Sequence, residues 1–124
     1  MGKARVGGQL WPAWDLGLLL GLGSQETALV LLRVPWRRTT VAVALRTGPC
    51  LAVQRVPQTW PLPARVFGDR PGAVSSAFEA AALGRPHEAV MGYLVEPCSL
   101  WTDAELAASA AAGQQEKPPA QGRL

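Results

Sequence analysis

Residues 40–46, Thr40-Val41-Ala42-Val43-Ala44-Leu45-Arg46, carry the clearest structural pattern in the chain. Val41, Val43 and Leu45 alternate with smaller or polar residues. Successive side chains of a strand point to opposite faces, so this alternation predicts a strand with one buried face.

Two neighbouring segments complete a predicted sheet. Residues 27–34 form a short apolar run that Pro35 stops, and residues 50–56 follow the turn residues Thr47-Gly48. Short apolar or alternating runs bounded by Pro and Gly are typical of strands joined by tight turns. The sequence therefore predicts a short antiparallel β-meander over residues 27–56.

The segment after the meander is rich in proline. Residues 57–72 contain four prolines and two glycines. Each proline lacks an N–H donor and restricts the residue before it, so we predict an irregular connector here. A short helix over 77–83 should follow, with Gly84 as its end, and residues 88–95 should form a further strand interrupted at Gly92.

A second helix is indicated by Thr102-Asp103-Ala104-Glu105. Thr at the N-cap with Glu three residues later is a capping box, which predicts a helix over 103–112 that ends at Gly113. Its alanines have high helix propensity but little surface to bury, so we expect this helix to stay on the surface.

The domain organisation follows from these elements. We expect a flexible apolar arm over 1–26, a single small domain over 27–112 and a disordered tail over 113–124. The predicted fold is a small α+β unit in which the β-meander precedes two short helices. The alternative is a largely disordered chain, because Leu, Val and Phe make up 30 of 124 residues, only a little above the floor of roughly 20% for folded chains.

The amino-acid composition reflects the base composition of the gene. Ala, Gly, Pro and Arg account for 54 of the 124 residues, and the chain has no Ile and no Asn. Codons for the abundant residues are rich in G and C, so the composition indicates a GC-rich reading frame. The ten arginines against two lysines show the same bias.

Positive charge is concentrated in the first part of the chain. Residues 1–70 hold nine basic and three acidic side chains. Trp36, Arg37 and Arg38 lie together at the predicted turn, where arginine is able to pair with phosphate and tryptophan to stack on a base. They form the candidate polyanion-binding site. Arg33, Arg46 and Arg55 would share one solvated face of the meander and extend the basic surface.

The sequence predicts no catalytic residue, no metal ligand and no cofactor. His87 is the only histidine, and it is expected to be a solvated loop residue. Cys50 and Cys98 are far apart with no Cys-x-x-Cys pair, so zinc-binding spacing is missing. Gly21-Leu22-Gly23 lacks the third glycine of a dinucleotide-binding loop, and no phosphate-binding loop motif is present.

The N-terminus resembles a weak secretory signal. Lys3 and Arg5 precede an apolar stretch over 16–23, but Pro12 and Asp15 interrupt the region. We expect the segment to be retained and the protein to be intracellular with reduced cysteines. Secretion, with a Cys50–Cys98 bridge, is the alternative. No apolar run approaches the ~18–20 residues of a membrane span.

These observations favour a non-enzymatic small protein that acts through an as yet unknown protein partner. The alternative from another class is a basic RNA or anionic-surface binder that uses Trp36, Arg37 and Arg38. A second alternative is a secreted or membrane-associated peptide.

Overall fold

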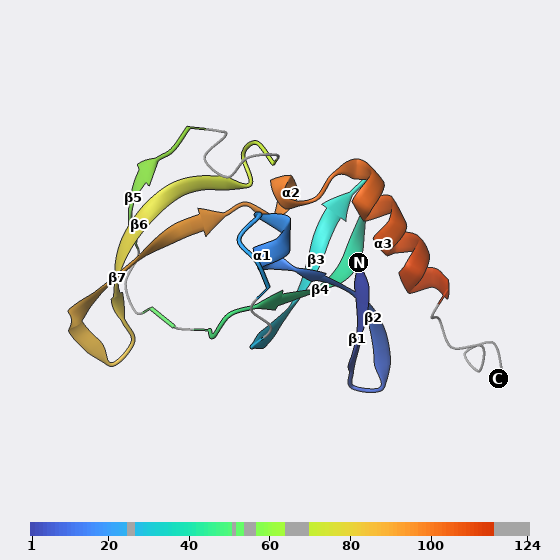
Figure 1. Cartoon of the computed structure of the whole chain (residues 1–124), viewed down its shortest axis with the longest axis horizontal. Helices are drawn as coiled ribbons and strands as arrows, with labels where there is room; N and C mark the ends of the chain where they lie inside the picture. The colour runs from blue at the N-terminus through green and yellow to red at the C-terminus, as the bar shows by residue number, and fades with distance from the viewer. Residues whose placement is uncertain (25–26, 51, 54–56, 64–69, 116–124) are drawn as a thin grey trace.

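The computed structural model describes residues 1–24, 27–50, 52–53, 57–63 and 70–115. The strands are β1 (Gly2–Val6), β2 (Gln9–Asp15), β3 (Ala28–Trp36), β4 (Thr39–Thr47), β5 (Gln58–Pro61), β6 (Val74–Ala82) and β7 (Arg85–Val95). The helices in this part of the chain are α1 (Leu16–Leu19), α2 (Pro97–Leu100) and α3 (Asp103–Gln115). Sheet A has the strand order β1-β2-β4-β3, and sheet B has the order β5-β6-β7. The fold is therefore a small α+β arrangement (Figure 1).

The β3–β4 hairpin confirms the two best-patterned strands. The predicted runs over 27–34 and 40–46 become strands over 28–36 and 39–47 that pair antiparallel along their whole length. Val41, Val43 and Leu45 are all buried on one face, as their alternation predicts. Local alternation was sufficient here because the two strands are joined by a two-residue turn and select each other directly.

The third strand of the meander is corrected by the structure. Residues 51 and 54–56 of the predicted strand lie outside the described residues, and Val53 forms an isolated bridge with Ala82 of β6. The position beside β4 belongs to β2, which pairs parallel to it from Ala13 to Asp15. A partner from the N-terminal segment thus replaces the one that follows along the chain.

The N-terminal segment is not the flexible arm that we expected. Residues 2–15 form the β1–β2 hairpin, and Gly7 and Gly8 make its turn with φ of +58° and +78°. Glycine adopts these left-handed conformations without the steric cost that a Cβ brings. The N-terminal residues are consequently part of sheet A, and Leu19 of α1 reaches the main core.

The helix predicted over 77–83 is also wrong, because this segment forms β6. Alanine favours helices when a segment is considered alone, but here β6 pairs with β5 on one side and β7 on the other, and such pairing outweighs weak local propensity. Gly84, expected to end the helix, has φ of +78° in the turn between β6 and β7.

The strand predicted over 88–95 is confirmed, and it continues through Gly92 instead of breaking there. The ring of Phe78, paired across from Gly92, occupies the space that a side chain would fill, since a Cβ built at Gly92 would lie 2.8 Å from that ring. The irregular connector over 57–72 is corrected in part, because residues 58–61 pair with β6 as β5.

Helix α3 begins with the predicted capping box. The Thr102 N–H donates to Glu105 Oε1 over 2.8 Å, and the Glu105 N–H donates to Thr102 Oγ1 over 3.1 Å. The helix ends at Gln115 rather than at Gly113, so the expected tail is helical over 113–115, and residues 116–124 lie outside the described residues. It does not stay on the surface, because Leu106, Ser109 and Ala112 are buried.

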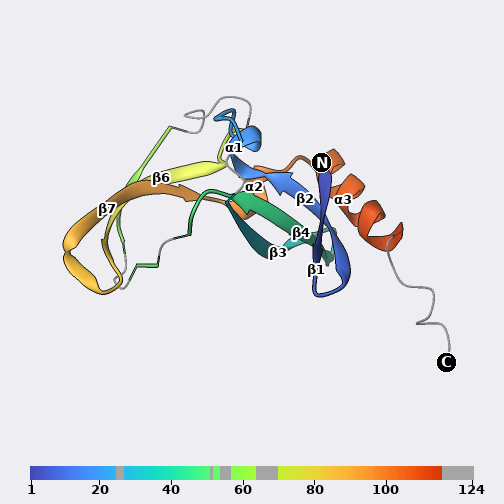
Figure 2. The same ribbon diagram turned by 60° about the horizontal axis from the view of Figure 1, so that its bottom comes forward.

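The main core lies between sheet A and the three helices. Its buried members are Leu19, Val34, Val41, Val43, Leu45, Ala73, Leu100, Trp101 and Leu106. Sheet B and α3 lie at opposite ends of the molecule, with α2 between them (Figures 1 and 2). One face of sheet A is therefore covered by helices, and we call it the inner face.

Candidate functional site

The predicted polyanion residues lie together at the β3–β4 turn, but two of them contact α3. Trp36 Nε1 donates a 2.8 Å hydrogen bond to Asp103 Oδ1, and Arg37 donates to Asp103 Oδ2 over 2.7 Å. The Arg37 guanidinium also stacks 4.5 Å from the centre of the Trp36 ring. Arg38 is exposed and forms no hydrogen bond or ion pair with the part of the chain that the structure describes.

These contacts give the turn a structural role. The Trp36 hydrogen bond, followed by the hydrogen bond and charge of Arg37, lowers the pKa of Asp103. Asp103 is the first residue of α3, where a carboxylate also interacts favourably with the helix dipole. A phosphate that binds Trp36 and Arg37 would have to displace this carboxylate, so Arg38 is the residue of the three best placed for an external anion.

A second polar cluster is centred on Arg70 and was not found from the sequence. Arg70 forms a two-pronged ion pair with Glu105, with N···O distances of 2.6 and 2.9 Å. It also donates to the carbonyls of Leu19 and Leu100, each over 2.9 Å. One guanidinium thus connects α1, α2 and α3. Of this cluster, only Glu105 was identified from the sequence, through its role in the capping box.

A cavity of about 310 Å³ borders this cluster and is also lined by Met1, Trp14, Asp15 and Arg46. Its charged groups already have partners. Glu105 is bound by Arg70, which lowers the pKa of Glu105 to about 2, and Asp15 accepts from the Ser24 hydroxyl and from the Leu18 N–H. The cavity therefore presents little unmatched charge to a ligand.

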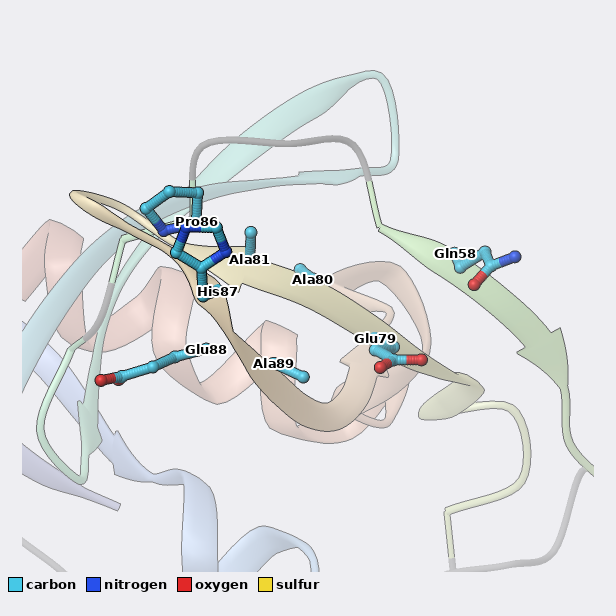
Figure 3. Close-up of a pocket in the computed structure, with 8 residues that line it drawn as sticks. All are labelled: Gln58, Glu79, Ala80, Ala81, Pro86, His87, Glu88 and Ala89. Carbon is cyan, nitrogen blue, oxygen red and sulfur yellow. The ribbon is translucent and has the colours of Figure 1, made fainter.

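A shallow pocket of about 360 Å³ lies between β5 and the β6–β7 hairpin (Figure 3). Ala80, Ala81 and Ala89 contribute small side chains to it, and Figure 3 shows Glu79 and Glu88 pointing in opposite directions. His87 is exposed, as expected, although it lies in β7 and not in a loop. No hydrogen bond or ion pair joins His87 to either carboxylate among the described residues.

The outer face of sheet A, opposite the helices, carries exposed apolar side chains on β3. The register places Leu29 opposite Arg46, Leu31 opposite Ala44, and Arg33 opposite Ala42, so all six side chains share this face. Ala13 and Trp11 of β2 continue it. Arg33 and Arg46 therefore share one face as predicted, while Arg55 lies outside the described residues.

On this face, buried alanines lie beside larger and more exposed apolar side chains. Ala44, Ala13 and Ala4 are buried and pack with Trp11. Beside them on β3, Leu29 and Leu31 remain 37% and 41% exposed. Large aliphatic side chains on a sheet are stabilised when they are covered, so these two leucines mark a surface suited to a further layer or strand.

Strand β3 is also an outer strand of its sheet. In a hairpin with a two-residue turn, the pair flanking the turn exchanges hydrogen bonds, and every second pair does the same. Trp36 and Thr39 are that flanking pair. The backbone N–H and C=O groups of Leu29, Leu31 and Arg33 therefore point away from β4, and only at Pro35 is the outward N–H missing.

Sheet B has its own exposed apolar residues, namely Trp60, Met91 and Tyr93. They occupy the same face, because Trp60 and Tyr93 both pair with Ala77. Strands β5 and β7 are the outer strands of this sheet. Strand β5 has only four residues, and β7 contains Pro86 and pairs with β6 through a register shift between Ala81 and Ala82. These features make both strands poorer templates for an added strand than the regular, nine-residue β3.

Other site chemistries find little support in the part of the chain that the structure describes. No group of three or more His, Cys, Asp and Glu side chains is arranged to hold a metal ion. Cys50 and Cys98 are both exposed and free. None of the described helices combines the length and apolar character needed to cross a bilayer.

No known protein family matches the sequence, and no curated protein or solved structure is significantly similar to it.

Proposed function

We propose that this is a non-enzymatic interaction protein that binds a protein partner through β3 and the outer face of sheet A. The observation that carries the proposal is the exposure of Leu29 and Leu31 on an outer strand whose outward backbone groups pair with none of the described residues. Long, apolar outer strands pair readily with other chains, and proteins normally protect them. A bound partner supplies this protection here.

The protective features of β3 are confined to one end. Pro35 removes one outward N–H, and Arg33 places a charge on the outer face. No such residue occurs from Leu29 to Leu32, a run of four aliphatic residues. The unprotected end of the strand therefore defines where the partner contacts should be strongest.

Site-specific photo-crosslinking in the native cell tests this proposal. A benzoylphenylalanine residue placed at Leu31 should give one dominant covalent adduct of defined mass, because this side chain would lie inside the interface. Introducing Leu29→Lys into the same chain should reduce the adduct at least tenfold, since a buried, unpaired ammonium opposes the contact. Mass spectrometry of the adduct gives the measurement.

The control is the same photoreactive residue at Leu83, which is 61% exposed in the turn between β6 and β7. It is more accessible than Leu31, which is 41% exposed, and it lies far from the proposed interface in the fold. Equal adducts at Leu31 and Leu83, or no adduct at Leu31, would contradict the proposal.

A second candidate function, polyanion binding at the turn, is favoured by one specific observation. Arg37 and Arg38 adopt φ of +47° and +65°. Such turns strongly prefer Asn-Gly, and left-handed backbone costs other residues roughly 1–2 kcal/mol. Arg38 holds this strained conformation while its side chain is exposed and forms no hydrogen bond or ion pair with a described residue, so it is available to an external anion.

One variant tests both the strain and the second candidate. Arg38→Gly should raise the free energy of unfolding by about 1 kcal/mol, because glycine removes the left-handed penalty. If the turn binds polyanions, the same variant should weaken binding to single-stranded RNA and reduce the salt slope by about one. Urea unfolding and a salt titration of RNA binding measure the two effects. Unchanged RNA binding would remove the second candidate while the stability result stood.

A further inference from the structure

We infer that the partner of β3 is an extended acidic segment of another protein that adds to sheet A as a fifth strand, antiparallel to β3. This inference rests on the proposed function and specifies the chemistry of the partner. At alternate positions along its chain, the segment would carry first a carboxylate and then two aliphatic side chains. That pattern follows from the residues that β3 presents at its free edge.

The backbone of β3 determines the binding mode. The N–H and C=O groups of Leu29, Leu31 and Arg33 point away from β4, as the hairpin register requires. An added strand is able to pair with all three residues without using the position opposite Pro35. Backbone pairing of this type provides affinity, while alternate side chains provide specificity.

The side chains of β3 determine the composition of the partner. On the outer face, an added strand would place successive side chains opposite Arg33, Leu31 and Leu29, in that order along an antiparallel chain. Aliphatic side chains fit opposite the two exposed leucines, where they cover apolar surface. Opposite Arg33, a carboxylate is complementary in charge.

Arg33 is the residue that would attract an acidic partner, because its side chain is exposed and forms no hydrogen bond or ion pair with any described residue. Arg46, which also lies on this face, already donates to the Lys3 carbonyl over 3.1 Å. The acidic residue of β2, Asp15, lies opposite Arg46 in the sheet and not opposite Arg33. The charge next to the free edge is therefore positive and unmatched within the described residues.

A second copy of this chain would fit the same edge less well. Antiparallel pairing of two β3 strands about Leu31 places each Arg33 opposite Leu29 of the other copy. Both guanidinium groups would then lie beside apolar side chains with no counter-charge, a poor environment for an ion. The unmatched charge favours an acidic partner over self-association.

Two blocked heptapeptides test the inference on the full-length protein. The first, Thr-Glu-Thr-Val-Thr-Val-Thr, has the predicted pattern, and the second has Lys in place of Glu. The acidic peptide should bind about fivefold to tenfold more tightly in low salt, because one cross-strand pair changes from attractive to repulsive. Amide NMR should show slower exchange at Leu29, Leu31 and Arg33 but not at Val30 or Leu32, whose N–H groups face β4.

The charge-reversal variant Arg33→Glu provides the decisive comparison. It should bind the Lys peptide more tightly than the Glu peptide, with the same set of protected amides, and 0.5 M salt should diminish either preference. Equal affinity for both peptides, protection at other strands, or a concentration-dependent dimer that excludes the peptides would overturn the inference. None of these outcomes would remove a crosslink at Leu31 in the cell, so failure of the inference is distinguishable from failure of the proposed function.

Discussion

Leu100→Ala is expected to lower the free energy of unfolding by about 3–4 kcal/mol, which lies within the range of roughly 2–5 kcal/mol for a buried leucine that leaves a cavity. Leu100 is completely inaccessible and is among the largest buried side chains of the core. It lies in α2, where its carbonyl also accepts a hydrogen bond from Arg70. A small domain has only about 5–15 kcal/mol of stability in total, so the loss should be evident in urea unfolding at pH 7.

The elements that lose hydrogen-exchange protection in Leu100→Ala are as informative as the loss of stability. Leu100 packs in one cluster with Leu19 and Val43, so the same substitution should reduce hydrogen-exchange protection in β2 and β4 as well as in α2 and α3. Leu83→Ala is the matched control, because this exposed leucine should cost no more than about 0.5 kcal/mol. A loss below 1 kcal/mol, or reduced protection confined to α2, would show that the core is not cooperative.

Local patterns in the sequence predicted the elements whose partners are also local. The β3–β4 hairpin was predicted because its strands adjoin the Arg37-Arg38 turn. The start of α3 was predicted because Thr102 and Glu105 cap one another within a single helical turn. In both cases the groups that stabilise the element lie within a few residues of it.

Elements stabilised from a distance were missed. The alanines of β6 indicate a helix until β5 and β7 supply hydrogen bonds on both sides. The N-terminal hairpin lacks a clear alternating pattern, and its place in the fold depends on β4, which pairs with it in parallel from Ala13 onward. A pattern read along one segment contains no information about such a partner.

The candidate sites were also predicted only where they depend on neighbouring residues in the sequence. The sequence placed Trp36, Arg37 and Arg38 at one turn, and the structure has them there. It did not reveal that Asp103, far along the chain, would bind two of them. The free edge of β3 was equally hidden, since which strand lies outermost depends on the order of the whole sheet.

The second large effect is expected at the Arg70–Glu105 ion pair. Glu105→Gln should lower the free energy of unfolding by about 2–3 kcal/mol at pH 7, because the guanidinium of Arg70, only about one-fifth exposed, loses its counter-charge. Gln still accepts the hydrogen bond from the Thr102 N–H, since either Glu or Gln suits this position of a capping box. The loss would thus report the ion pair rather than the cap. Glu88→Gln is the matched control, because its ion pair with Arg85 is largely exposed and should contribute less than about 0.5 kcal/mol.

The pH dependence of this difference provides a separate test of the same contact. Bound by Arg70, Glu105 has a pKa of about 2 in the folded protein instead of the ordinary 4.5. A carboxyl whose pKa falls on folding stabilises the fold fully above its unfolded pKa and loses that contribution as the pH drops toward its folded pKa. The difference between the native protein and Glu105→Gln should therefore be constant from pH 6 to 8 and decrease steadily between about pH 5 and 2. Urea unfolding at pH 7, 4 and 3 measures it, and a difference that stays constant down to pH 3 would show that Arg70 does not hold the charged form of Glu105.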